Sequence, residues 1–143
     1  MSRALLIVDI QNDYFPGGAH PLHEPEAAAA AARSVLDRFR ASDEPVIDKD
    51  APNAFLHTNL ERELRERGVE ELVVCGMMTS MCVDATVRAA ADLGFSVTLV
   101  HDACAAPALS FGGTDVPAPA VGAAFIAALG EGCATLASAA ELS

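Results

Sequence analysis

Short apolar runs alternate with amphipathic segments along almost the whole chain. Runs rich in β-branched residues predict buried strands at residues 4–9, 46–48, 71–75, 95–100 and 134–136. Helical periodicity predicts helices at residues 26–40, 60–67, 80–93 and from about 117 onward, with a loop at 102–115. Strands that alternate with helices through short connections favour right-handed βαβ crossovers. We therefore expect an α/β fold with three layers, α/β/α, around a Rossmann-like parallel sheet of about five strands.

Three of the predicted strands lead directly to a residue that can take part in chemistry. Asp9 closes the first strand, Lys49 follows the second, and Cys82 lies in the first turn of the helix after the third. The carboxyl ends of parallel strands share one edge of a sheet, so these side chains are expected to converge there. Unpaired N–H groups and the helix dipole favour a thiolate in a first helical turn, which makes Cys82 a candidate nucleophile. Each residue also has an ordinary interpretation: Asp9 could cap a loop, Lys49 could be solvated, and Cys82 could be a small core residue. The expected convergence of all three at one edge of the sheet favours the functional interpretation.

The composition is that of an ordinary globular chain with a strong negative charge. A length of 143 residues is enough for a full core, so we expect a single domain, 1–143. The net charge of −11 argues against nucleic-acid binding and against attachment to an anionic membrane. We found no segment of transmembrane length and no signal-peptide pattern at the start. Its four cysteines form no Cys-x-x-Cys pair, and their spacing indicates neither a zinc site nor a disulfide framework, so we expect a reduced, cytoplasmic protein.

Four segments together resemble the isochorismatase-like cysteine hydrolases, a superfamily that includes nicotinamidases and other small amidases. They follow one another in the expected order along nearly the whole chain: Val8–Gly18, Asp48–Lys49 with Asn53–Phe55, Val74–Cys82 and His101–Ala105. The Gly-x-x-Thr-x-x-Cys element that ends at Cys82 is the most specific of them. The resemblance implies hydrolysis of a C–N bond in a small amide, through a thioester on Cys82.

The resemblance also assigns a role to each member of an Asp-Lys-Cys triad. Asp9 would accept the thiol proton as general base, and Lys49 would keep Asp9 ionised and stabilise the thiolate. Cys82 would attack the amide carbonyl. The N–H groups of Met78 and Cys82 would form the oxyanion hole, and the Met77–Met78 peptide bond would be cis.

Four further residues are candidates for contact with the substrate. Gln11 follows Asp9 and could orient the substrate or simply cap a loop. Phe15 and Phe55 could form aromatic walls of the pocket, or they could pack as outlying parts of the core. Thr79 could hydrogen-bond the turn before the cysteine or cap the helix.

The histidines are weaker candidates for chemistry. His20 and His23 lie in a Gly/Pro-rich loop, where such a pair is more typical of a solvated or pocket-rim position than of a metal site. The zinc-binding segment of family nicotinamidases falls in a region that this chain lacks, so we expect no catalytic metal and no cofactor. His101 ends a strand at the functional edge and could pair with Cys82, but the order of the four segments favours the Asp-Lys-Cys arrangement.

One departure from the family pattern concerns the first half of the chain. Members of the family usually have another strand and a long loop before the lysine strand, whereas here Arg40 runs almost directly into Glu44. The chain is therefore expected to be shortened there, and a missing strand would leave a gap or an exposed edge in the sheet. Residues 45–48 could also occupy the place of the missing strand in the sheet. The position of Lys49, which follows them, therefore depends most on how the chain is shortened.

Three functions remain open on the sequence alone: an amidase that acts on a small-molecule amide substrate, an isochorismate-type vinyl ether hydrolase, and a catalytically silent homologue that acts as an oligomeric ligand-binding module. The presence of the cysteine favours the amidase over the vinyl ether hydrolase. The family relationship also implies a homodimer or homotetramer.

Overall fold

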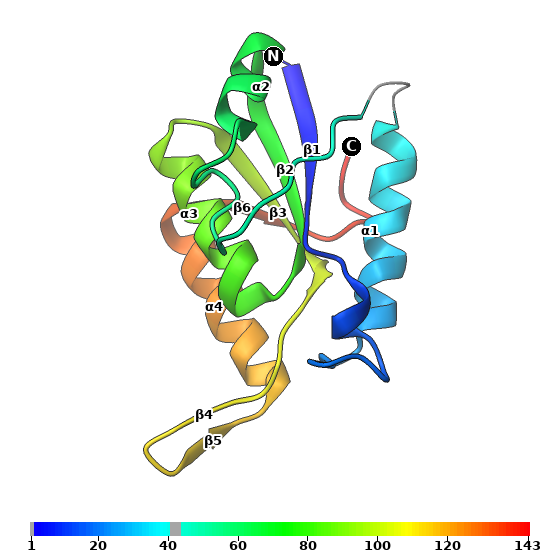
Figure 1. Cartoon of the computed structure of the whole chain (residues 1–143), viewed down its shortest axis with the longest axis vertical. Helices are drawn as coiled ribbons and strands as arrows, with labels where there is room; N and C mark the ends of the chain where they lie inside the picture. Colours follow the sequence, from blue (N-terminus) through cyan, green and yellow to red (C-terminus); the bar gives the residue numbers. More distant parts are fainter. Residues whose placement is uncertain (1, 41–43) are drawn as a thin grey trace.

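The computed structural model describes residues 2–40 and 44–143. Its centre is a four-stranded parallel sheet in the order β1-β2-β3-β6, formed by β1 (Ser2–Val8), β2 (Val69–Met77), β3 (Ser96–Ala105) and β6 (Thr135–Ala137). One face of the sheet is covered by α1 (Pro25–Phe39), and the other by α2 (Leu60–Glu66), α3 (Asp84–Asp92) and α4 (Ala118–Gly132) (Figure 1). The expected α/β fold with three layers is confirmed.

Each face of the sheet has its own apolar core, and β2 contributes to both. Because successive side chains of a strand point to opposite faces, Leu72 and Val74 pack under α2, α3 and α4, whereas Val73 and Cys75 pack under α1. All four side chains are at most 1% exposed. Burial on both faces explains why this strand is a continuous apolar run in the sequence.

The strand expected at residues 46–48 is not present, and this prediction is wrong. Residues 46–48 are not part of any strand, and among the described residues β1 pairs with β2 alone. The segment therefore does not fill the place of a missing strand beside β1. Val46 is 92% exposed and Ile47 packs against the core under α2, α3 and α4. Without a neighbouring strand, Val46 and Ile47 form no hydrogen-bonded ladder. The described sheet therefore has four strands rather than about five.

Residues 102–115, expected to be a loop, contain regular structure at both ends. Strand β3 continues to Ala105, and an antiparallel hairpin follows, made of β4 (Leu109–Phe111) and β5 (Thr114–Val116). Gly112 and Gly113 connect its strands with φ angles of 58° and 79°. Two consecutive positive φ angles are what a two-residue type I′ hairpin turn requires. The Gly-Gly pair between alternating apolar and polar residues was the signal for this hairpin, and sequence reasoning missed it.

Gly76 sets the spacing between the strands that carry the candidate site. It pairs with Val8 on β1 and has a φ of 140°, and a Cβ atom there would collide with the backbone carbonyl of Val8. Asp9 follows Val8 directly, and Gly76 precedes the turn that leads to Cys82. The close approach of the two backbones therefore brings the ends of β1 and β2 together.

Replacing Gly76 with alanine is expected to lower the free energy of unfolding by about 3 kcal/mol, because the methyl group must displace the backbone of β1. Chemical denaturation measures the change. Gly68→Ala is the matched control, since Gly68 also has a positive φ, of 66°, but an added methyl group there would extend into open space, with no atom beyond the adjoining residues within 4 Å. Equal losses in the two variants would show that only the backbone angle matters at Gly76.

Candidate active site

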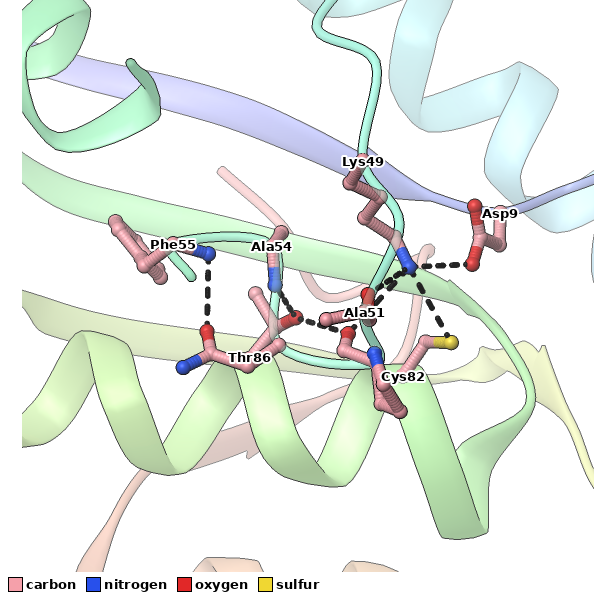
Figure 2. A network of polar contacts seen from close by, with 9 residues as sticks. Asp9, Lys49, Ala51, Ala54, Phe55, Cys82 and Thr86 are labelled. Carbon is pink, nitrogen blue, oxygen red and sulfur yellow. Dashed lines mark hydrogen bonds and ion pairs between the residues drawn. The ribbon is translucent and has the colours of Figure 1, made fainter. Parts of the chain in front are cut away.

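The structure brings Asp9, Lys49 and Cys82 together at the carboxyl edge of the sheet, although Lys49 does not follow a strand. Asp9 follows β1 with a φ of 46°, and Cys82 lies on a π-helical turn, η2 (Thr79–Val83), that follows β2 and leads into α3. Lys49 reaches both from the irregular segment after α1. Its Nζ lies 2.7 Å from Oδ2 of Asp9 and 3.4 Å from Sγ of Cys82 (Figure 2).

The position of Lys49 is fixed by the helix that carries the cysteine. Nζ of Lys49 also donates to the backbone carbonyl of Ala51, at 2.8 Å. The loop that follows is held by Thr86, whose Oγ1 accepts from the N–H of Ala54 at 3.0 Å and donates to the carbonyl of Pro52 at 3.4 Å (Figure 2). Thr86 is fully buried on α3. These contacts hold the lysine in place without a strand at residues 46–48.

Sequence reasoning missed Thr86. The available signal was its spacing, because a residue four positions after Cys82 lies on the same face of a helix. The side chains at these two positions therefore both face the segment that carries Lys49.

The electrostatics of the site favour a protonated thiol at rest. Cys82 is 9% exposed. Burial, with the hydrogen bond and charge of Asp9, raises the pKa of the Cys82 thiol, and Lys49 offsets only part of this rise. The expectation of a thiolate favoured by the first helical turn is therefore wrong, because burial and a nearby carboxylate outweigh it.

Lys49 remains an ammonium. Partial burial acts to lower its pKa, but the hydrogen bond and charge of Asp9, together with Cys82, raise the pKa of Lys49 above its ordinary value. The site at neutral pH thus contains a positive charge between the acid and the thiol.

The turn before Cys82 has the backbone that the family resemblance implied. The Met77–Met78 peptide bond is cis, which confirms the prediction. The carbonyl of Met78 accepts hydrogen bonds from the N–H groups of Met81, at 3.1 Å, and Val83, at 3.2 Å. The N–H of Cys82, between them in sequence, makes no such bond to Met78, as expected for a π-helical turn rather than a regular α-helix.

The candidate substrate-binding residues lie in different environments. Gln11 is exposed and its side chain makes no cap hydrogen bond to the helical turn η1 (Asn12–Tyr14). Phe15 packs beside a small cluster under the start of α1, and Phe55 packs against the larger core with its ring 6.0 Å from that of Phe95. Thr79 is 1% exposed, and the η2 turn begins after Met78 without a side-chain cap, so a capping role for Thr79 is wrong.

The histidines lie apart from the triad. His23 pairs with Glu24 at 3.6 Å and both side chains are more than half exposed. Within residues 2–40 and 44–143, no three or more His, Cys, Asp or Glu side chains are grouped as metal ligands would be. The polar side-chain neighbours of the Cys82 thiol there are Asp9 and Lys49, and a pair with His101 is not formed.

Cys75 and Cys104 differ from Cys82 in having no lysine partner. Burial raises the pKa of Cys75 and of Cys104 from 9.0 to about 12. We expect iodoacetamide to label Cys82 before either of them at neutral pH, since Lys49 opposes the effect of burial only at Cys82. Peptide mass spectrometry of a time course measures the order, and earlier labelling of Cys75 or Cys104 would contradict it.

The same burial predicts a loss of stability in alkali. The folded state holds the proton of Cys75 up to a pKa of about 12, whereas the unfolded thiol loses it near 9.0. Its contribution is therefore complete below pH 9 and is lost as the pH rises toward 12, at about 1 kcal/mol per pH unit. Urea denaturation of Cys75→Ala should show a shallower decline over this range than the wild type. Equal declines would contradict the burial of this thiol.

Comparisons with known proteins agree with this geometry. The Isochorismatase domain model matches residues 41–111. The isochorismatase family protein YddQ of Bacillus subtilis (strain 168) is 41% identical over 165 residues, which cover 90% of this chain and 92% of YddQ. The chain belongs to the isochorismatase family.

Its relatives include hydrolases and amidases. An isochorismatase from Pseudomonas putida KT2440 superposes with a TM-score of 0.90 at 30% identity, covering 99% of this chain and 90% of that one. Streptothricin hydrolase of Streptomyces noursei is 39% identical over 98 residues, 68% of this chain but 34% of that protein. N-carbamoylsarcosine amidase from Thermoplasma acidophilum shares the fold, with a TM-score of 0.82 at 19% identity over 100% of this chain and 99% of that one. The chain is thus an isochorismatase-family hydrolase.

The comparison with YddQ also bears on the shortened region. Its 165 aligned positions exceed the 143 residues of this chain, so the alignment must open gaps here. The gaps agree with a chain that is shorter than YddQ within the aligned region. Among the described helices, none has the length and apolar character needed to cross a membrane.

Proposed function

We propose that this chain is a cysteine hydrolase that cleaves the C–N bond of a small amide. The observation that carries the proposal is the position of the Lys49 ammonium, 2.7 Å from Asp9 and 3.4 Å from the Cys82 sulfur. The amidases among its relatives support the same reaction class. The net charge of −11 favours neutral or cationic amides over anionic ones.

The raised pKa of Cys82 makes a general base necessary for the first step. Asp9 takes the thiol proton as sulfur attacks the carbonyl carbon, and the C=O bond opens to an oxyanion. The oxyanion collapses, the C–N bond breaks, and the amine leaves with the proton from Asp9. Water then attacks the thioester, gives its proton to Asp9, and releases the carboxylic acid. Thiol departure returns that proton to sulfur.

Lys49 serves both charged states of this cycle. Before attack, Nζ of Lys49 pairs with the carboxylate of Asp9. During proton transfer the same Nζ lies beside the thiolate that develops on Cys82. A fixed positive charge between the two groups lowers the cost of moving negative charge from oxygen to sulfur.

The oxyanion hole consists of the N–H groups of Met78 and Cys82. In residues 2–40 and 44–143 the Met78 N–H donates to no backbone carbonyl, and the Cys82 N–H does not donate to the carbonyl of Met78. The free N–H of Met78 is available to a developing oxyanion, and the N–H of Cys82 lies on the turn that carries the attacking sulfur. Gln11, Phe15, Phe55 and Thr79 remain proposed substrate contacts, and no catalytic metal or cofactor is required by these steps.

The test is a panel of small amides and one vinyl ether, isochorismate, assayed with the wild-type protein. We expect ammonia or amine release from at least one amide and no cleavage of the vinyl ether. Cleavage of the vinyl ether alone would move the chain to the isochorismatase reaction. A folded protein that cleaves nothing would favour the silent ligand-binding module.

A further inference from the structure

A cavity of about 360 Å³ lies between the start of α1, the end of β3 and the first turns of α4. Asp9, Lys49 and Cys82 do not line it, so it is separate from the candidate active site. Small residues such as Ala105 and Gly122 make up most of its wall. An apolar cavity of roughly 150 Å³ is enough to hold benzene, so this one has room for a phenyl ring with substituents.

Thr79 places an unpaired hydroxyl in the wall of this cavity. It begins η2 and is 1% exposed, and within the described part of the chain its side chain has no hydrogen-bond partner. The unpaired hydroxyl of Ser80 is closed off from solvent, whereas that of Thr79 keeps a small accessible area, and the cavity is where this area lies. The thiol of Cys104, also in the wall, already donates to the carbonyl of Val100 at 3.4 Å. Since a buried hydroxyl without a partner is unfavourable, Thr79 is expected to bond a group that enters the cavity.

The mouth of the cavity is negatively charged. Its exposed side chains are His23, Glu24 and Asp102. Glu24 lies 3.6 Å from the imidazole of His23, and Asp102 accepts from the N–H of Ala139 at 2.8 Å. A carboxylate has room for several donors, so both can accept further hydrogen bonds. No lysine or arginine of the described ranges lines the cavity, and the mouth therefore favours a cation.

We propose that this cavity binds a small organic cation, whose ammonium pairs with Glu24 and Asp102 and whose far end carries a polar group that bonds the Thr79 hydroxyl. The apolar body between these ends packs among the alanines. An anion would meet two carboxylates, and a ligand without the polar end would leave the hydroxyl of Thr79 unpaired. The site adjoins the turn that carries Cys82, because Thr79 begins that turn, but its occupation does not depend on amide hydrolysis.

Tyramine is a suitable probe, because it has an ammonium at one end of a phenyl ring and a hydroxyl at the other. Phenethylamine lacks the hydroxyl, tyrosol has a neutral hydroxyl in place of the ammonium, and 4-hydroxyphenylacetate has a carboxylate there. Isothermal titration calorimetry measures the affinity of each. We expect the wild type to bind tyramine at least about tenfold more tightly than phenethylamine or tyrosol, and to bind no 4-hydroxyphenylacetate.

Three variants place the bound probe in the cavity. Thr79→Val should remove the advantage of tyramine over phenethylamine, because valine has a similar shape but cannot bond the phenol. Gly122→Leu should abolish binding by filling the cavity, where the first added carbon meets its nearest neighbour, Ala106, at 3.9 Å. Gly132→Leu is the matched control on α4, since Gly132 does not line the cavity and an added carbon there meets nothing within 4 Å. This control should bind tyramine as the wild type does.

Asp9→Asn distinguishes the cavity from the candidate active site. A cation bound at the triad would pair with Asp9 and lose affinity in this variant, whereas tyramine in the cavity should bind unchanged. The proposal would be overturned by a wild type that does not bind tyramine, by equal affinities for tyramine and phenethylamine, by binding that survives Gly122→Leu, or by binding that Asp9→Asn weakens. If Gly122→Leu does not fold, the comparison of the two amines in Thr79→Val decides.

Discussion

Replacing Cys82 with alanine is expected to reduce amide hydrolysis at least about a thousandfold, because the variant has no atom that can form the thioester. The fold should persist, since the change removes one sulfur from a side chain that is 9% exposed. Amine release at saturating substrate measures the rate, and far-UV circular dichroism with thermal melting checks the fold.

Cys133→Ala is the matched control for the loss of a thiol. Cys133 lies at the end of α4 and is half-buried, away from the residues of the triad. This variant should keep the wild-type rate. A Cys82→Ala protein that retains more than about a tenth of the activity would exclude a covalent role for the cysteine.

Asp9→Asn is expected to separate thiol reactivity from catalysis. Hydrolysis should fall by about 10²- to 10⁴-fold, because the amide side chain cannot accept the thiol proton. The pH midpoint for alkylation of Cys82 should nevertheless move down, because the hydrogen bond and charge of Asp9 raise the pKa of this thiol. Iodoacetamide labelling rates as a function of pH give the midpoint for each variant.

Lys49→Met provides the opposite change at the same site. The charge and hydrogen bond of Lys49 lower the pKa of Cys82, so their loss should move the alkylation midpoint up. Both variants should be poor hydrolases while their midpoints diverge. Midpoints that move in the same direction would contradict the arrangement of one acid and one lysine around the sulfur.

Local patterns predicted most of the sheet and helices but not the elements that depend on a neighbour. The run at Leu72–Cys75 is apolar throughout because both of its faces are buried, and it was correctly predicted as a strand. Val46 and Ile47 are also apolar and β-branched, but no strand lies beside them, so no strand forms. The β4–β5 hairpin was missed although its Gly-Gly turn was visible in the sequence.

The candidate site also combines residues that local pattern could place with one that depends on a distant neighbour. Asp9 and Cys82 could be placed from the strands that precede them, whereas Lys49 depends on contacts between its loop and Thr86, 37 positions further along the chain. The protonation of Cys82 was predicted wrongly from its helical turn alone. It depends on burial and on Asp9, which the sequence places in a distant segment.

The most direct test of the proposed chemistry is the partition of an acyl-enzyme between water and hydroxylamine. Two amides that share an acyl group but differ in the leaving amine are hydrolysed in the presence of hydroxylamine, and hydroxamate and acid are measured. A thioester on Cys82 is the same intermediate from both amides, so the ratio of hydroxamate to acid should be identical. A ratio that changes with the leaving amine would show direct attack by water and would contradict catalysis through Cys82.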